Sequence, residues 1–377
     1  MKKKHYLLCS DLLSGGGVEK VLTAVASFLA QQGHAVTIAT DRGSAAQCRR
    51  LCHRRVRYVC RTFPWLPEVT RFSPKWFFQR CRYALFCLRQ MKLRHTRYDT
   101  AIAMKEGPSM QAVAAMDARR KFAWVHVDFR HLHWSRFSFP SPEAERQCMQ
   151  AFDRVICVSE AAAQSIRSTI GDPGNLQVCY NPIPAHAILE MAQKPPVLKK
   201  GDRPLFVAAG RLSAEKQYPL LLNAVARLAT QYDFDLWIIG DGPQRQALEK
   251  FVQENRLSHV TLAGNLDNPY PLLKQADCFV SSSKAESYGL AIQEALLLGV
   301  PVLTTACPAM YEVLDSRCGL IVPNDEDSLT SAMETLLQQP DRLQAMRSAI
   351  KSFVDSSGLW EGRLQNIYQV LEGEKEL

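Results

Sequence analysis

Residues 278–305 read CFVSSSKAESYGLAIQEALLLGVPVLTT and set the architecture of the second half of the chain. An apolar run at 278–281 leads into a polar turn, then into a nearly all-apolar helix that ends at Gly299, and then into a second apolar run at 302–305. Two buried strands joined by a helix form a βαβ unit, in which the strands are parallel. We therefore predict a parallel sheet with helices on its faces.

The same alternation of strand and helix extends in both directions. The chain is interrupted by a Pro- and Lys-rich passage at 181–204, which we interpret as a linker. The sequence thus predicts an α/β protein with two Rossmann-like, doubly wound parallel-sheet domains facing across a cleft: an N-terminal domain at 1–183, a linker at 184–204 and a C-terminal domain at 205–354. The expected strands are 6–9, 35–40, 56–60, 100–104, 122–127, 155–158 and 178–180, and then 205–209, 236–239, 260–263, 278–281, 302–305 and 320–322.

Composition agrees with a folded, water-soluble chain. The 377 residues are 47% hydrophobic and 22% charged, which argues against a disordered or fibrous protein. The longest apolar runs reach about half of the ~20 residues of a membrane span, and we expect no export signal after the basic start at 1–4. The twelve cysteines form no CxxC pair, so we expect a cytoplasmic protein without disulfides.

Charge is divided unevenly between the two halves. Residues 1–183 hold 28 Lys and Arg against 13 Asp and Glu, a balance of +15, and the remainder holds 18 against 24, a balance of −6. Residues 49–97 are basic and rich in aromatic side chains, which suits an anionic surface. We left three interpretations open: the cytoplasmic face of a membrane, a nucleic acid, and a basic helix whose aromatic residues belong to the core.

Several strand ends carry residues suited to binding an anion. Gly15-Gly16-Gly17 follows the first strand and precedes a helix, but Lys20 stands where a dinucleotide fingerprint needs its third glycine, so a nicotinamide cofactor is not expected. The turn at 210–216 carries Arg211 and Lys216, two cations that suit a diphosphate; pairing with Glu215 on the surface is the alternative.

Two carboxylates and one histidine are the other candidates. Glu286 lies in the turn before the apolar helix, and Glu294 lies within that helix, where a charge needs a polar partner such as a ligand hydroxyl. His126 lies near the end of the strand at 122–127, so we expect it to face the cleft. We expect no metal site at His126, His131 and His133, because no ligand cluster accompanies them, and the DxD at 233–235 precedes its strand.

The residues also carry a family resemblance. Glu286 and Glu294 with seven residues between them, the turn at 210–216, and the segments at 238–243, 262–264 and 299–302 occur in the order seen in retaining glycosyltransferases of family 4, which have the GT-B fold. The likeness is strong over about 205–322. It is looser in the first half, where it rests on the glycines at 15–17, His126 and the segments at 158–159 and 181–182.

The resemblance implies roles for these residues and a nucleotide sugar as the donor. It implies no cofactor, no metal, and a C-terminal helix at 355–373 that crosses back onto the first domain. Arg211 and Lys216 resemble the residues that neutralise the donor diphosphate, and the residues that resemble those offering backbone N–H groups to its phosphates are Gly16, Gly17, Gly289 and Leu290. Glu294 resembles the ribose ligand, and Glu286 resembles the residue that holds the donor sugar. His126 resembles the histidine that faces the sugar and the acceptor, while Gly264 and Asn265 resemble the residues that flank the base.

Our leading expectation is therefore a retaining hexosyltransferase. It would move a hexose or N-acetylhexosamine from a nucleotide sugar, with UDP favoured and GDP-mannose second, to a lipid-linked or polysaccharide acceptor at the inner membrane face. Two alternatives stay open: a nucleic-acid-binding protein that uses 49–97, and a nucleotide-sugar epimerase. No nucleic acid partner is expected under the leading hypothesis.

Overall fold

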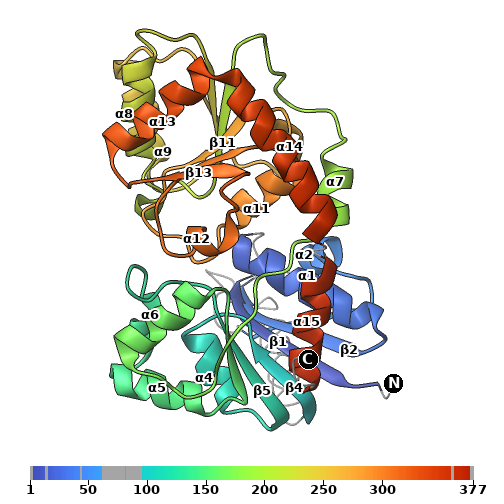
Figure 1. Ribbon diagram of the computed structural model, residues 1–377. Helices are drawn as coiled ribbons and strands as arrows, with labels where there is room; N and C mark the ends of the chain where they lie inside the picture. The colour runs from blue at the N-terminus through green and yellow to red at the C-terminus, as the bar shows by residue number, and fades with distance from the viewer. Residues whose placement is uncertain are drawn as a thin grey trace. The chain divides into compact units, whose positions relative to one another are not determined.

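The structure is a computed structural model that describes residues 3–12, 16–42, 45–61, 81, 96–357 and 361–373 (Figure 1). The chain divides into two compact units, each described here by itself. Unit 1 comprises Met1–Val158, Ala162–Pro182 and Arg363–Leu377, and unit 2 comprises Ser159–Ala161 and Ile183–Gly362. Most of the basic aromatic region at 49–97, namely 62–80 and 82–95, lies outside the described residues.

Unit 1 is built on a seven-stranded sheet in the order β3-β2-β1-β4-β5-β6-β7, and each pair of neighbours is parallel. Strand order reverses between β1 and β4, so their carboxyl ends form the topological switch point, where ligands of such sheets bind. The strands are β1 (His5–Leu12), β2 (Ala35–Arg42), β3 (Arg57–Cys60), β4 (Tyr98–Ala103), β5 (Ala118–Val125), β6 (Arg154–Cys157) and β7 (Leu176–Val178).

Local sequence explains the centre of this sheet. Five consecutive residues of β1, from Tyr6 to Ser10, are buried, as expected for a strand covered on both faces. The helix α1 buries one face through Val21, Leu22, Val25 and Leu29, against β1 and β2. Unit 1 contains the helices α1 (Gly17–Gln31), α2 (Ala45–Leu51), α4 (Pro108–Ala114), η1 (Trp134–Ser138, a 3₁₀ helix), α5 (Pro142–Gln150) and α6 (Glu160–Ile170).

The last helix, α15 (Glu361–Glu372), is fastened to unit 1 by polar contacts. Glu372 accepts hydrogen bonds from the Lys4 ammonium and the Tyr6 hydroxyl. The Tyr368 hydroxyl lies 2.8 Å from His34 Nε2, and Arg120 donates to the Leu371 carbonyl at 2.7 Å. The end of the chain is therefore part of unit 1, whereas the preceding helix α14 (Pro340–Ser357) is part of unit 2.

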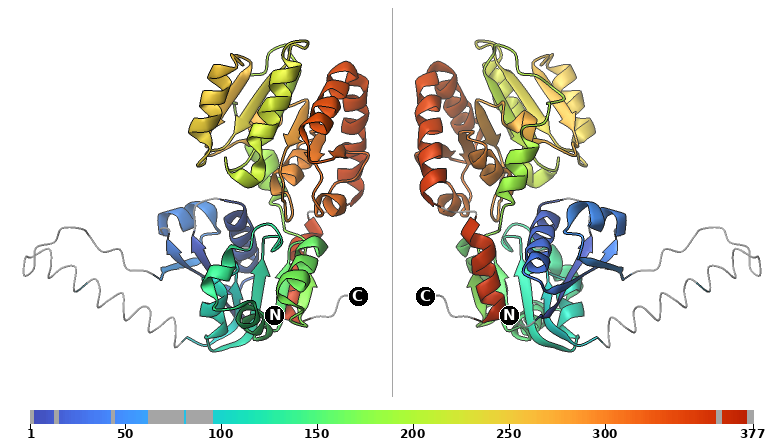
Figure 2. Two further views of the ribbon diagram at one scale, coloured as in Figure 1. Left: turned by 90° about the vertical axis from the view of Figure 1, so that its left-hand side faces the viewer. Right: turned by 90° about the vertical axis from the view of Figure 1, so that its right-hand side faces the viewer.

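Unit 2 is built on a six-stranded sheet in the order β10-β9-β8-β11-β12-β13, again with parallel neighbours. Helices flank this sheet (Figure 2). Among them, α8 contacts α9 and α13, α13 contacts α14, and α11 contacts α7 and α14. The strands are β8 (Leu205–Ala209), β9 (Asp235–Ile239), β10 (Val260–Gly264), β11 (Cys278–Ser281), β12 (Val302–Thr305) and β13 (Gly319–Val322). The helices are α7 (Ala185–Met191), η2 (Ala214–Lys216, a 3₁₀ helix), α8 (Tyr218–Leu228), α9 (Arg245–Glu254), α10 (Tyr270–Leu273), α11 (Leu290–Leu297), α12 (Met310–Val313), α13 (Glu326–Gln338) and α14.

The predicted fold class, two parallel-sheet α/β domains, is confirmed. Many strand ends differ from the prediction by one to three residues, and two differences are larger. The strand expected at 122–127 is β5, which begins four residues earlier because the backbone of Ala118–Lys121 pairs with β4, although three of these four side chains are charged. The segment at 184–204 contains the helix α7, and unit 2 includes it.

Two further observations concern the described residues alone. None of their helices is long and apolar enough to cross a bilayer. The cysteines among them are free thiols, eight of which lie in unit 1 and three in unit 2.

Candidate active site

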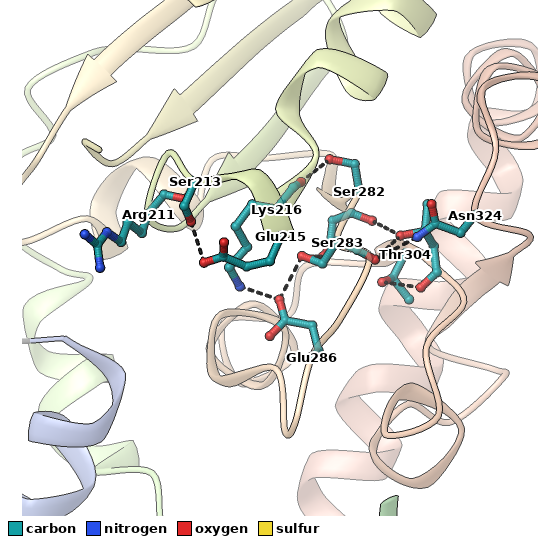
Figure 3. A network of polar contacts seen from close by, with 11 residues as sticks. Arg211, Ser213, Glu215, Lys216, Ser282, Ser283, Glu286, Thr304 and Asn324 are labelled. Atoms are coloured by element: carbon teal, nitrogen blue, oxygen red, sulfur yellow. Dashed lines mark hydrogen bonds and ion pairs between the residues drawn. The ribbon is translucent and has the colours of Figure 1, made fainter. Parts of the chain in front are cut away.

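The turns that follow β8 and β11 bring Lys216 and Glu286 together (Figure 3). These strands are neighbours, so their carboxyl ends meet at one edge of the sheet. Lys216 Nζ lies 2.5 Å from Glu286 Oε1, and the same oxygen accepts a hydrogen bond from Ser283 Oγ at 2.9 Å. The two ionic side chains keep 22% and 15% of their surface exposed, so both are partly desolvated yet reachable from solvent.

Main-chain and side-chain bonds join the two turns to each other. The Lys284 N–H donates to the Glu215 carbonyl at 2.8 Å, and Ser282 Oγ donates to the Lys216 carbonyl at 2.8 Å. These bonds fix the backbone of Lys216 relative to the turn that carries Glu286. Such preorganisation lets charged groups act on a ligand without first reorganising.

A second set of bonds holds the Ser283 carbonyl from the far side. Thr305 Oγ1 donates to it at 2.8 Å, and Asn324 Nδ2 donates to it at 3.0 Å (Figure 3). Because the Ser283 hydroxyl bonds Glu286, the ends of β11, β12 and β13 together fix the position of this carboxylate.

The pair offers two opposite kinds of binding group side by side. The ammonium of Lys216 suits a phosphate oxygen, and the carboxylate of Glu286 accepts hydrogen bonds from hydroxyls. A cavity of about 10 Å³, lined by Lys216, Tyr218 and 281–283 among others, lies beside the pair. Burial raises the pKa of the neighbouring Tyr218 hydroxyl, and the charge of Glu286 adds to that effect.

Arg211 belongs to the same turn as Lys216 but is not part of the network. Its side chain is exposed, and its guanidinium points away from the Lys216–Glu286 pair (Figure 3). Glu215, the alternative partner of both cations, instead accepts a hydrogen bond from Ser213 Oγ at 2.5 Å.

Close backbone packing explains the glycines near this turn. A Cβ added at Gly240 would lie 2.0 Å from the Gly210 carbonyl oxygen, and one at Gly242 would lie 2.5 Å from the Leu212 carbonyl oxygen. The Leu212 N–H also donates to the Asp241 carbonyl at 3.0 Å. The glycines therefore allow the turn after β9 to hold the turn that carries Arg211 and Lys216.

Gly264 and Asn265 lie at the end of β10, beside this interlock. The Gly264 carbonyl accepts from the Gly240 N–H at 2.8 Å, and Asn265 is exposed. A Cβ at Gly264 would lie 3.1 Å from Arg245 Nη1. Arg245, which no pattern in the sequence indicates, is the first residue of α9 and is partnered by Glu249 Oε1 at 2.7 Å.

Gly289, Leu290 and Glu294 belong to the start and middle of α11. Gly289 is the N-cap of the helix and has a positive φ of 68°, and the first turn begins at Leu290, four residues after Glu286. Glu294 is only 6% exposed and accepts a hydrogen bond from the Tyr270 hydroxyl at 3.3 Å. Glu294 is therefore buried and partnered within unit 2 and does not lie on a solvated helix face.

Gly16, Gly17 and His126 belong to unit 1. Gly16 and Gly17 are exposed at the N-terminus of α1, after the end of β1. His126 directly follows β5, so all three lie near carboxyl ends of strands in the same sheet. Its Nε2 atom is buried without a hydrogen-bond partner, whereas the ring makes a hydrogen bond with the Met104 backbone.

The environment of His126 keeps its imidazole neutral. Burial, followed by the charge of Lys105, lowers the pKa of His126 to about 3. Since Nε2 has no partner, we assign the bond with Met104 to Nδ1, which makes the buried Nε2 atom an acceptor without a donor.

This shift predicts a pH-dependent stability that the variant His126→Asn lacks. The unfolded-state pKa is about 6.5, so the stability gained from a neutral His126 is present above that pH and is lost as the pH falls toward 3. Between pH 6.5 and 5.0 the free energy of unfolding of the wild type should fall by about 1.5 kcal/mol more than that of the variant. Urea unfolding at both pH values measures the difference, and parallel losses would contradict it.

Two of the residues that we set aside as metal ligands have other partners. His133 Nε2 lies 2.7 Å from the buried Glu145, and Asp233 forms an exposed ion pair with Arg203 at 3.0 Å. Within the described residues, no three His, Cys, Asp or Glu side chains gather as a metal site would require.

Two family profiles match the chain, one for each half. The profile described as Glycosyltransferase Family 4 matches residues 15–186, and that described as Glycosyl transferases group 1 matches residues 203–339. Together with two parallel-sheet domains, these matches define the class of GT-B glycosyltransferases. The chain belongs to group 1 of that class.

Known relatives are similar to parts of the chain. The lipopolysaccharide core biosynthesis glycosyltransferase LpsE of Rhizobium meliloti is 34% identical over 139 residues, which is 36% of this chain and 40% of LpsE. A GDP-mannose-dependent alpha-(1-6)-phosphatidylinositol dimannoside mannosyltransferase of Mycobacterium tuberculosis is 29% identical over 37% of this chain and 36% of its own. The chain thus spans well under half the length of these two relatives.

A solved structure resembles the fold along nearly the whole chain. HepE of Anabaena, in complex with UDP-glucose, superposes with a TM-score of 0.76 over 98% of this chain and 100% of its own, at 18% identity. This similarity shows the fold.

Proposed function

We propose that this protein is a retaining glycosyltransferase that moves a hexose or N-acetylhexosamine from a nucleoside-diphosphate sugar to a lipid-linked or polysaccharide acceptor. The observation that carries the proposal is the preorganised Lys216–Glu286 pair at the strand ends of unit 2. It combines a cation for a phosphate with a carboxylate for sugar hydroxyls, and Glu286 lies in the turn that leads to the N-terminus of α11.

In this proposal the residues of unit 2 hold the donor. Lys216 neutralises charge that develops on the β-phosphate, helped by Arg211 once its exposed side chain turns inward and by the N–H groups of Gly289 and Leu290. Glu286 accepts hydrogen bonds from the donor sugar. Glu294 binds the ribose hydroxyls, either in place of its hydrogen bond with Tyr270 or in addition to it. Gly264 and Asn265 flank the base.

The reaction itself needs no protein nucleophile in this scheme. The bond between the sugar C1 and the β-phosphate oxygen breaks, the acceptor oxygen bonds C1 on the same face, and its proton passes to the departing phosphate. Fixed cations and helix N–H groups stabilise the leaving group, so we propose that no metal is required. His126, neutral in the structure, would accept a hydrogen bond from a sugar or acceptor hydroxyl, and Gly16 and Gly17 would approach the phosphates.

The choice of donor and acceptor rests on the relatives. HepE was solved with UDP-glucose, which favours a UDP-sugar, and the mycobacterial relative's GDP-mannose makes a GDP-sugar the second candidate. Both curated relatives are named for glycolipids, which favours a lipid-linked acceptor. Peripheral binding at the cytoplasmic membrane face rests only on the basic composition of 49–97.

A thermal-shift panel tests the proposed donor class. One nucleoside diphosphate and its sugar conjugates should raise the melting temperature by about 2–4 °C at 100 times the dissociation constant, because binding to the native state adds about 2.7 kcal/mol of stability. The corresponding nucleoside and inorganic phosphate serve as controls.

The outcomes of the panel separate the competing functions. Stabilisation by a nucleotide sugar, followed by transfer to an acceptor, is the expected result. Salt-dependent binding of oligonucleotides with no stabilisation by any nucleotide would instead favour a nucleic-acid-binding protein. Release of an isomerised sugar without an acceptor would indicate an epimerase.

A further inference from the structure

Glu106 is a buried carboxylate of unit 1 that the proposed mechanism does not use. It follows β4 and has no exposed surface. Burial raises the pKa of its carboxyl, and hydrogen bonds and the charge of Lys105 oppose that effect. A buried carboxylate strongly destabilises the fold unless hydrogen-bond donors satisfy its oxygen atoms.

The two oxygens of Glu106 accept from two different segments. Oε2 accepts from the His126 backbone N–H at 3.2 Å, directly after β5. Oε1 accepts from Trp134 Nε1 at 2.6 Å, in the 3₁₀ helix η1. Glu106 therefore joins the end of β4 to the residue after β5 and to a segment eight residues further along the chain.

The surroundings leave Glu106 and Trp134 little freedom to move. Lys105 Nζ lies 4.2 Å from the centroid of the Trp134 ring and 3.3 Å from Asp11 Oδ2, at the end of β1. A Cβ at Gly107 would lie 2.9 Å from the Trp134 ring, so only glycine permits this close approach. The charged cluster Asp11, Lys105, Glu106 thus spans the topological switch point between β1 and β4.

We propose that Glu106 is a positioning residue for His126. By binding the His126 N–H on one side and Trp134 on the other, it fixes the backbone from which the imidazole projects, and so fixes the position of the buried, unpartnered Nε2 atom. The consequence for turnover rests on the proposed function, because it requires that His126 meets the sugar or the acceptor. The consequence for the imidazole does not.

The test compares Glu106→Gln with a matched control, Glu145→Gln. Glu145 is also fully buried in unit 1 and also accepts two hydrogen bonds, from His133 at 2.7 Å and Ser135 at 2.6 Å, but it does not contact His126. In each variant an amide NH₂ replaces one acceptor oxygen and meets a donor, so both should unfold at lower urea concentrations.

Only Glu106→Gln should alter His126. The protein is labelled with ¹⁵N-histidine, and the signals of His126 among the nine histidines are identified by their loss in His126→Asn. Two-dimensional NMR should then show changed Nδ1 and Nε2 chemical shifts for His126 in Glu106→Gln. The same shifts should be unchanged in Glu145→Gln. With the donor found by the panel, Glu106→Gln should lower kcat at least 10-fold and leave the donor KM within 2-fold. Glu145→Gln should keep both within 2-fold.

Equal effects of the two variants on kcat and on the His126 signals would overturn the proposal. If the wild type turns over no nucleotide sugar, the proposed function fails, but the NMR comparison still decides whether Glu106 positions His126.

Discussion

Replacing Glu286 with glutamine should lower sugar transfer by about 100-fold or more without weakening the binding of the bare nucleoside diphosphate. The carboxylate is held by Ser283 and Lys216 in the position where, in our proposal, it accepts hydrogen bonds from the donor sugar. Removing one preorganised group that acts in the transition state raises the activation free energy by about 3 kcal/mol. The nucleoside diphosphate lacks the sugar, and removal of a nearby negative charge also frees Lys216 for the phosphates.

The two readouts move in different directions, which makes the prediction specific. Transfer is measured as product formed per enzyme with the donor identified by the panel, and diphosphate affinity is measured by calorimetry. A variant that kept wild-type turnover would remove Glu286 from the site. A variant that lost transfer and diphosphate binding together would indicate that Glu286 only supports the fold of the turn.

Lys216→Met should weaken nucleoside diphosphate binding by about 10- to 100-fold. A charge-assisted hydrogen bond contributes about 1.5–3 kcal/mol, and methionine keeps a similar apolar stem while it removes the charge. Lys250→Met provides the matched control, since Lys250 is also in unit 2 but is 73% exposed and pairs only with Glu254 among the described ion pairs. Its diphosphate affinity should equal that of the wild type.

The double variant Lys216→Met/Glu286→Gln separates direct binding from an indirect effect. If Lys216 contacts the diphosphate, the double variant stays weak. If Lys216 matters only because it neutralises Glu286, then removing both charges together should restore wild-type affinity, and the direct role of Lys216 would be refuted.

Much of the fold follows from local sequence. Strands β8, β11 and β12 match the predicted 205–209, 278–281 and 302–305, since each is a short buried apolar run bounded by turn residues. Such runs are the strongest signal of a parallel sheet. The start of β5 was not predictable in this way, because its first residues are charged and their strand geometry comes from pairing with β4.

The site was only partly predictable. Lys216 and Glu286 were candidates because each follows a strand, but nothing in either segment alone shows that the turns after β8 and β11 interlock. Glu106 and Arg245 carried no local signal: each is an ordinary charged residue whose place depends on a partner 20 or more residues away or on packing against Gly264. The hydrogen bonds from Thr305 and Asn324 to the Ser283 carbonyl are likewise long-range and invisible in the sequence pattern.

A calorimetric titration of the intact protein with uridine and guanosine diphosphates tests the central claim most directly, namely that Lys216 and Glu286 form part of a nucleotide-sugar site. We predict saturable binding of one equivalent of one of these diphosphates, with the affinity retained in Lys250→Met and weakened by about 10- to 100-fold in Lys216→Met. Failure of both diphosphates to bind at millimolar concentration, or binding that is unchanged in Lys216→Met, would contradict the account.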